Sequence, residues 1–82
     1  MEVRVMFFGR LKQDTGAKEK TLEFHQTSLT VGDLIEALKV QYPALVPQLA
    51  TVAYAVNDEL VNPEHVLHHG DQAALLPPVS GG

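Results

Sequence analysis

The chain has 82 residues, an apolar fraction of 45% and a formal net charge of -4. That length is enough for one small globular domain, but so short a chain buries too little surface to build a deep active site of its own. The absence of cysteine excludes disulfides, thiolate metal sites and cysteine nucleophiles, and the acidic balance, with only six Lys and Arg residues spread along the chain, argues against nucleic acid as a partner.

The first residues, 1–5, lead directly into an alternating pattern of apolar and polar side chains. No basic stretch followed by an apolar one precedes this pattern, as it would in a secretory signal. No segment approaches the length that spans a membrane. We therefore expect a cytoplasmic protein without a membrane partner.

The first third of the chain predicts two strands joined by a short helical turn. Residues 3–9 alternate with a period of two, which indicates a strand that Gly9 ends. A helical turn is expected over residues 11–15, and residues 20–25 alternate again. We expect these two strands to pair as a hairpin.

The main helix is expected to begin after Thr30. A threonine followed three residues later by Asp33 resembles a capping box, with aspartate in place of the usual glutamate. Apolar side chains then recur at helical spacing, namely Val31, Leu34, Ile35, Leu38 and Tyr42. Pro43 is expected to stop the helix, which gives a predicted range of 31–42.

The second half of the chain predicts short strands separated by turns. Residues 43–51 contain two prolines and are expected to form an irregular loop or a single turn. Further strands are expected, in chain order, over 52–56, 60–61 and 72–76, with turns at 57–58, 63–65 and 70–71. The resulting order resembles the ubiquitin-like β-grasp, an α+β fold with a mixed four- to five-stranded sheet packed on one main helix.

The last six residues differ in composition from the rest of the chain. Two prolines cannot continue a strand ladder, and two terminal glycines have no side chain to pack. We therefore expect a domain over residues 1–76 and an extended tail made up of Pro77, Pro78, Val79, Ser80, Gly81 and Gly82. At about 3.3 Å per residue, the tail reaches roughly 20 Å, which is far enough to enter another protein's pocket.

The reactive group of such a tail is the terminal carboxylate of Gly82. Because Gly81 and Gly82 have no Cβ, the chain end is thin and leaves this carboxylate unshielded. A free carboxylate is ionised at neutral pH and is a poor electrophile, since neither oxygen is a good leaving group. Joining it to AMP would supply a leaving group, and attack by a sulfur donor would then produce a thiocarboxylate. By itself, however, a terminal pair of glycines is also common in tails without a function.

Three segments resemble the small subunits of molybdopterin synthase, which are ubiquitin-like sulfur carriers. They are residues 5–11, residues 55–61 and residues 70–82, where a Gly-Asp turn, an apolar strand, Pro-Pro-Val and a serine precede the two glycines. The likeness spans nearly the whole chain and is loosest over residues 12–52, where only the pattern of elements agrees. The chain departs from the family at residues 75–76, where two leucines stand in place of the common aromatic residues.

The resemblance implies that Gly82 is adenylated by an ATP-dependent activating enzyme related to those acting on ubiquitin, and is then converted to a thiocarboxylate. The tail next enters the active site of a large subunit, where sulfur passes to cyclic pyranopterin monophosphate and two deliveries build the dithiolene of molybdopterin. The chain is then a non-catalytic carrier without a permanently bound cofactor. The family also implies a heterotetramer of two large and two small subunits.

Alternation predicts an apolar patch on the sheet face opposite the core. The core is expected to contain Val3, Val5, Phe7, Leu22, Phe24, Leu34, Ile35, Leu38, Val56 and Leu75. Met6, Phe8 and Leu76 then fall on the other face, with Leu60 nearby, and a small domain seldom leaves such a patch unused. We interpret the patch as the docking face for both partners. The alternative is that helices or loops cover it and that Phe8 or Leu76 belongs to the core.

Several polar side chains lie outside this patch and have weaker claims to a functional role. Arg10 and Lys12 follow the first strand and are candidates for contacts with acidic groups of a partner, although exposed basic residues usually only solvate a surface. Three histidines within residues 65–69 do not predict a metal site, because neighbours on a strand cannot easily face one ion. Asp71 is expected to shape the turn that contains it.

Three other functions stay open at this point. A sulfur carrier of thiamine synthesis would share the fold, the Gly-Gly end and the activation chemistry, although Pro-Pro-Val-Ser before the glycines favours the molybdopterin pathway. A ubiquitin-like modifier would instead have Gly82 joined to a protein lysine. A plain binding module would keep its function after deletion of Gly82.

Overall fold

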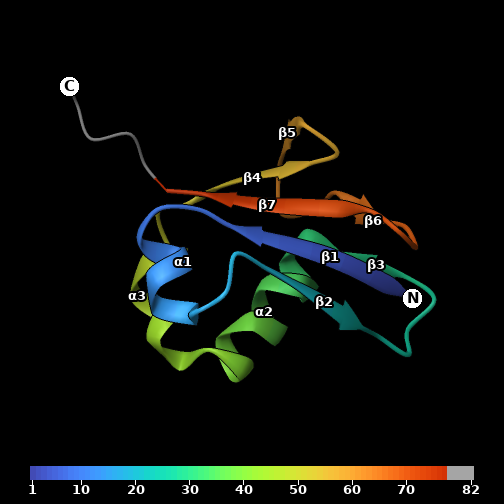
Figure 1. The fold of residues 1–82 in the computed structure, drawn as a ribbon. Helices are drawn as coiled ribbons and strands as arrows, with labels where there is room; N and C mark the ends of the chain where they lie inside the picture. The colour runs from blue at the N-terminus through green and yellow to red at the C-terminus, as the bar shows by residue number, and fades with distance from the viewer. Residues whose placement is uncertain (78–82) are drawn as a thin grey trace.

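A sheet and a layer of helices make up the protein. The computed structural model describes residues 1–77, and within this range the helices lie against one face of the sheet, whereas the other face carries none (Figure 1). In chain order the elements are β1 (Glu2–Phe7), α1 (Arg10–Thr15), β2 (Glu19–Glu23), β3 (Leu29–Thr30), α2 (Val31–Gln41), the 3-10 helix η1 (Pro43–Leu45), α3 (Val46–Leu49), β4 (Ala53–Val56), β5 (Glu59–Val61), β6 (Val66–Leu67) and β7 (Gln72–Leu76).

The main sheet has five strands in the spatial order β2-β1-β7-β4-β5. Its central strands β1 and β7 run parallel, whereas the other neighbouring strands are antiparallel. A separate pair of two-residue strands, β3 and β6, lies beside the main sheet. A mixed sheet packed on one main helix is the predicted β-grasp topology, and the predicted α+β class is confirmed.

The helix α2 begins and ends for the reasons that the sequence predicts. The Thr30 hydroxyl accepts a hydrogen bond from the Asp33 amide at 3.1 Å, and the Asp33 carboxylate accepts one from the Thr30 amide at 3.0 Å. This reciprocal capping box satisfies two amides that have no partner within the helix. The helix ends at Gln41, one residue before Tyr42, because Pro43 disfavours helical geometry in the residue that precedes it. None of the helices within residues 1–77 is long and apolar enough to cross a membrane.

Most strand boundaries agree with the prediction, but the hairpin differs. The strand β1 ends at Phe7, two residues before the predicted end, because the chain turns at Gly9, whose φ of 58° is unfavourable for other residues. The strand β2 ends at Glu23. Phe24 therefore lies beyond the strand and packs against the edge of the core, so its predicted place within the core is wrong.

Residues 43–51 form more regular structure than the predicted loop or single turn. The 3-10 helix η1 continues directly into α3, and each helix has a proline in its first two positions. Proline is tolerated there because the amides of a first helical turn have no partner in the helix. Leu45 and Leu49 recur at helical spacing, a signal that the predicted loop did not take into account. Both leucines are buried in the core.

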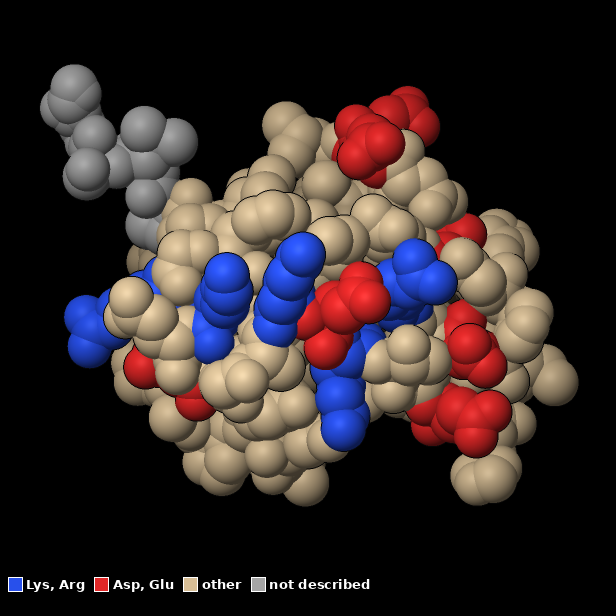
Figure 2. All heavy atoms as spheres, in the orientation of Figure 1, with Lys and Arg blue, Asp and Glu red and all other residues tan. Residues whose placement is uncertain are grey.

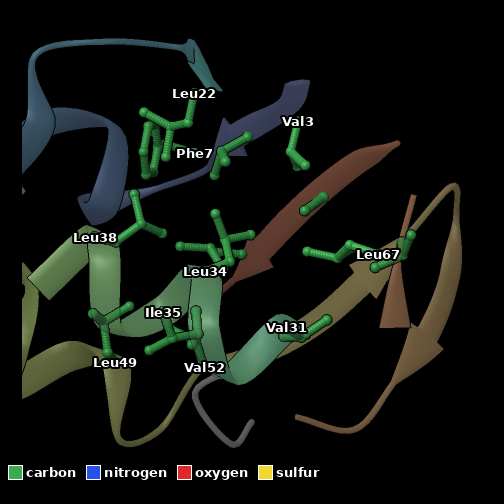
Figure 3. Close-up of a cluster of buried hydrophobic side chains, with 14 of the residues drawn as sticks. Val3, Phe7, Leu22, Val31, Leu34, Ile35, Leu38, Leu49, Val52 and Leu67 are labelled. Atoms are coloured by element: carbon green, nitrogen blue, oxygen red, sulfur yellow. The ribbon is translucent and has the colours of Figure 1, made fainter. Parts of the chain in front are cut away.

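The core fills the space between the sheet and α2. Figure 3 shows Val3, Phe7 and Leu22 from the sheet together with Leu34 and Leu38 of α2. The buried residues of the core are Val3, Val5, Phe7, Leu11, Leu22, Leu29, Val31, Leu34, Ile35, Leu38, Leu45, Leu49, Val52, Val56, Leu67, Ala73 and Leu75. The alternation of β1 and β7 thus leaves every second residue of these strands for the opposite sheet face.

Candidate docking face and tail root

The tail leaves the sheet where β1 and β7 both end. Because these strands are parallel, with Phe7 opposite Leu75, their last residues lie at the same end of the sheet. Ala53, the first residue of β4, pairs with Leu76 at this end. Pro77 is the last described residue and marks what we call the tail root. The remaining predicted tail residues, Pro78, Val79, Ser80, Gly81 and Gly82, lie outside the described residues.

Gly9 lies directly against the tail root. A Cβ added at Gly9 would come within 3.2 Å of the Pro77 Cγ, which is closer than ordinary carbon contact. The proline ring therefore packs onto a stretch of backbone that has no side chain. This contact places the start of the tail beside the first residue of α1, Arg10.

The sheet face opposite α2 carries a row of apolar residues across four strands. In register, Met6 of β1 lies opposite Ala74 of β7, Ala74 opposite Ala55 of β4, and Ala55 opposite Leu60 of β5. Residues opposite one another in a sheet point to the same face, so the row has large side chains at both ends and two methyl groups between them. We call this surface the outer apolar face; it comprises Met6, Ala53, Ala55, Leu60, Ala74 and Leu76. Phe8 follows the end of β1 without a register partner, and its place beside this face stays a prediction.

Strand register places Met6, Leu60 and Leu76 on the predicted face. Leu60 is 74% exposed and Phe8 is 40% exposed, so neither belongs to the core. Met6 and Leu76 are half-buried, and within residues 1–77 no helix covers the face. Among the described residues, helices therefore do not cover the patch, whereas cover by loops stays a prediction. Docking itself stays a prediction.

The small members of the outer apolar face were missed. Ala55 is only 8% exposed, yet it is not part of the core between the sheet and α2. Its neighbour in register, Ala74, is half-buried. Alanine carries no strong sequence signal for a docking surface, and only the strand register shows that these methyl groups form the floor between Met6 and Leu60.

The two predicted basic residues lie in α1, next to the tail root. Arg10 Nε is 3.8 Å from Asp14 Oδ2 one helical turn away, and the Asp14 carboxylate also accepts a hydrogen bond from the Gln48 side chain. Lys12 lines a shallow surface hollow with Lys18, which follows α1. Sequence reasoning missed Lys18, although five of the six Lys and Arg residues fall within residues 1–20.

At the opposite end of the sheet, polar side chains stabilise the turns through hydrogen bonds. The Asp71 carboxylate accepts hydrogen bonds from the His68 amide at 2.8 Å and from Asn57 Nδ2 at 3.0 Å. The predicted role of Asp71 in its turn is confirmed. His69 Nδ1 accepts a hydrogen bond from the Glu2 amide at 3.0 Å, so this histidine has a structural partner. These residues lie far along the sheet from Pro77 and do not join the candidate site.

Comparison with known proteins identifies the family. Residues 5–82 match the model of the ThiS family. A molybdopterin synthase sulfur carrier subunit of Chlamydomonas reinhardtii is 33% identical, with the whole of both chains covered. The crystal structure of SAMP1 from Haloferax volcanii is 27% identical with a TM-score of 0.89, again covering both chains completely.

A second solved structure is a protein-protein complex. It joins subunits 1 and 2 of the molybdopterin-converting factor from Helicobacter pylori, and the matching chain is 32% identical with a TM-score of 0.73 over the whole of both chains. These likenesses extend over the β-grasp domain and the Gly-Gly end alike. The chain belongs to the ThiS family of ubiquitin-like β-grasp proteins.

Proposed function

We propose that the chain is the sulfur carrier subunit of a molybdopterin synthase. The observation that supports this most strongly is its likeness, over the whole length of both chains, to a molybdopterin synthase sulfur carrier subunit. No large cavity is needed for this role, because the reactive group lies at the chain end and a partner supplies the catalytic groups. The domain then serves to bind partners and to direct its tail into them.

The proposed chemistry begins with activation of the Gly82 carboxylate. Its oxygen attacks the α-phosphate of ATP on an activating enzyme, which forms an acyl-adenylate and releases pyrophosphate. A sulfur donor then attacks the carbonyl carbon, AMP leaves, and a C-terminal thiocarboxylate results. Gly81 and Gly82 suit both steps, because an attacking group meets no side chain near the carbonyl.

The thiocarboxylate then acts as the sulfur nucleophile in the large subunit. Its sulfur forms a C–S bond to cyclic pyranopterin monophosphate in place of a C–O bond, whose oxygen departs as the leaving group. Water then attacks the carbonyl of the resulting thioester and breaks its acyl C–S bond, which leaves the sulfur on the pterin and restores the Gly82 carboxylate. Two such deliveries would complete a dithiolene. The Helicobacter pylori relative was solved as a complex of subunit 1 with subunit 2, which supports a large-subunit partner for this chain.

The outer apolar face is suited to hold the carrier while the tail reacts. Leu60 projects freely beside a floor formed by Ala55 and Ala74, so a convex apolar partner surface could fit against it. Complete burial of a leucine side chain contributes about 1.5–3 kcal/mol to association. Because Leu76 belongs to this face and directly precedes Pro77, a docked partner would also meet the tail root.

A ubiquitin-like modifier is the second candidate function. The likeness to SAMP1, with a TM-score of 0.89, favours it, because a further similar structure, from Methanosarcina acetivorans, carries the name small archaeal modifier protein 1. The activation step would be the same, but a lysine amine would attack the adenylated Gly82 in place of sulfur. The two functions differ only in the nucleophile, so one chain could serve both.

Intact mass spectrometry tests the proposal. The full chain and a chain lacking Gly82 would be incubated with ATP, a sulfide source and the activating enzyme of the same organism. We expect a mass gain equal to the replacement of one oxygen by sulfur in the full chain only. No gain in the full chain would contradict the sulfur-carrier function, and transfer of the whole chain to a lysine of another protein without that gain would favour the modifier.

A further inference from the structure

The charges of this acidic protein are unevenly placed. Residues 1–20 contain five of the six Lys and Arg residues but only three of the ten Asp and Glu residues. Figure 2 shows basic side chains in a band that runs from the α1 side across the middle of the molecule, with some acidic side chains within and below this band. Further acidic side chains gather over β5 and on the side away from α1. The molecule is therefore polarised despite its net charge of -4.

Three of these five basic residues form a positive end at the tail root, whereas Lys20 lies opposite Val5 and Arg4 lies opposite Gln72, toward the other end of the sheet. Gly9, which packs against Pro77, lines the same surface hollow as Lys12 and Lys18. Arg10 begins α1 at the next position after Gly9. We call Arg10, Lys12 and Lys18 the basic cluster.

The negative end lies at the far end of the sheet. Glu2 and Glu23 are opposite one another where β1 begins and β2 ends. Asp58 lies in the turn between β4 and β5, next to Glu59, and that turn is at the end of β4 away from Leu76. Like charges gathered at one end repel an acidic partner from that side.

We propose that the basic cluster docks against acidic side chains around the partner channel that receives the tail, so that the carrier approaches its partners tail first. The inference rests on the proposed carrier function and deepens it by naming the chemistry of the partner surface. The outer apolar face would then supply most of the affinity, and the basic cluster would orient the encounter.

The lysines of the basic cluster are available for such a contact. Among residues 1–77, neither Lys12 nor Lys18 has a carboxylate within 4.0 Å, whereas Lys39 of α2 lies 3.0 Å from Glu36. Arg10 is 3.8 Å from Asp14 at an exposed position, where such a pair is weak and open to exchange. The acidic neighbours of the cluster, Asp14 and Glu19, do not outnumber its three basic residues.

Distance favours partner carboxylates over a nucleotide phosphate as the target. Five residues separate Pro77 from the carboxylate that receives AMP, and an extended run of that length spans about 16 Å. A nucleotide joined to an inserted tail would thus lie far from Lys12 and Lys18. The rim of the channel, in contrast, must surround the tail close to Pro77.

The test compares charge removal at the tail root with charge removal elsewhere, and each single variant at the tail root is matched to Lys39→Gln. The double variant Lys12→Gln/Lys18→Gln and its single variants remove charge at the tail root, whereas Lys39→Gln removes one charge on the helix side of the sheet. Association of each full-length carrier with the activating enzyme would be followed by stopped-flow at low salt and at about 0.5 M salt, where exposed charges are screened.

We expect the double variant to associate about three- to tenfold more slowly than the parent at low salt and equally fast at high salt. Lys39→Gln should behave as the parent at both salt concentrations. Equal slowing by Lys39→Gln and by one of the other single variants would mean that only net charge matters, and would overturn the inference. Unchanged rates in all variants would also overturn it.

Two further readouts separate the remaining outcomes. Adding ATP to the 15N-labelled carrier alone should leave the amide shifts of Lys12 and Lys18 unchanged; specific shifts there would assign the cluster to a nucleotide and contradict a partner surface. At saturating enzyme, the double variant should still form the thiocarboxylate. If the parent forms the thiocarboxylate but its association rate does not depend on salt, only the inference about the basic cluster fails. If the parent neither binds the enzyme nor forms the thiocarboxylate, the proposed carrier function fails as well.

Discussion

Asn57 and Asp71 join two turns across the end of the sheet that lies opposite the tail root. Asn57 Nδ2 donates to Asp71 Oδ1 at 3.0 Å, and Asn57 Oδ1 accepts from the Gln72 amide at the same distance. Asn57 also has a φ of 50°, a conformation that asparagine adopts more readily than most residues. One side chain thus connects the β4–β5 turn to the start of β7.

This connection predicts a specific loss of stability. Asn57→Ala should lower the free energy of unfolding by about 2–3 kcal/mol, because it removes two hydrogen bonds and strains the backbone. Asp58→Ala is the control, since Asp58 has a φ of 71° but no side-chain hydrogen bond within residues 1–77; it should cost about 1 kcal/mol. Urea denaturation measures both, and equal losses would show that the hydrogen bonds contribute nothing.

The capping box of α2 gives a second stability prediction. Thr30→Ala should cost about 1 kcal/mol, because the Asp33 amide loses its acceptor at the start of the helix. Thr27→Ala, at an exposed position outside any element, should change stability by less than about 0.5 kcal/mol. Thermal unfolding followed by circular dichroism distinguishes the two variants. A Thr30→Ala variant with the same unfolding midpoint as the parent would argue against a contribution of the cap to stability.

The two-residue pair of β3 and β6 can be tested through neighbouring residues. Leu67 is fully buried, whereas Val66 is 46% exposed. Leu67→Ala should therefore cost about 2–4 kcal/mol by leaving a cavity, and Val66→Ala less than about 1 kcal/mol. Chemical denaturation of both variants measures the difference. Comparable losses would mean that Leu67 is not held in the core in solution.

The docking role of the outer apolar face predicts a binding defect without a stability defect. Leu60→Ser should weaken binding of the large subunit at least about tenfold, because an exposed anchor is lost from the interface. Val40→Ser is the matched control, since Val40 is 82% exposed on α2, on the helix side of the sheet. Both variants should keep the parent's unfolding midpoint. Isothermal titration calorimetry measures the affinities, and unaffected binding by Leu60→Ser would exclude this face.

The narrow chain end predicts a defect in catalysis by the partner. Gly81→Val should lower the kcat of the activating enzyme for the carrier by more than tenfold, because a branched side chain next to the terminal carbonyl obstructs a narrow channel. KM should change little, since the outer apolar face is intact. The formation of acyl-adenylate, followed by pyrophosphate release, reports both constants. A raised KM with unchanged kcat would mean that the tail contributes binding and does not need to be thin.

Sequence reasoning succeeded wherever a pattern was long or a motif was local. The alternation in β1, the apolar spacing of α2 and its capping box each depend on neighbouring residues, so they were readable without a structure. It failed for β3 and β6, because two residues are too few to show a period. It failed for Leu45 and Leu49 because the two prolines of this segment favoured a loop over the helical spacing of these leucines. Phe24 was misplaced because the end of a strand depends on where its partner strand ends.

The sequence by itself determined the family, the β-grasp order and the chemistry proposed for Gly82, since these follow from local patterns and from a motif at the chain end. Only the tertiary structure decided which residues share a surface. The register of four strands places Ala55 and Ala74 between Met6 and Leu60, and the parallel pairing of β1 with β7 brings Gly9 against Pro77. Contacts between residues so far apart in the chain arise from strand pairing and packing, and no local sequence pattern predicts them.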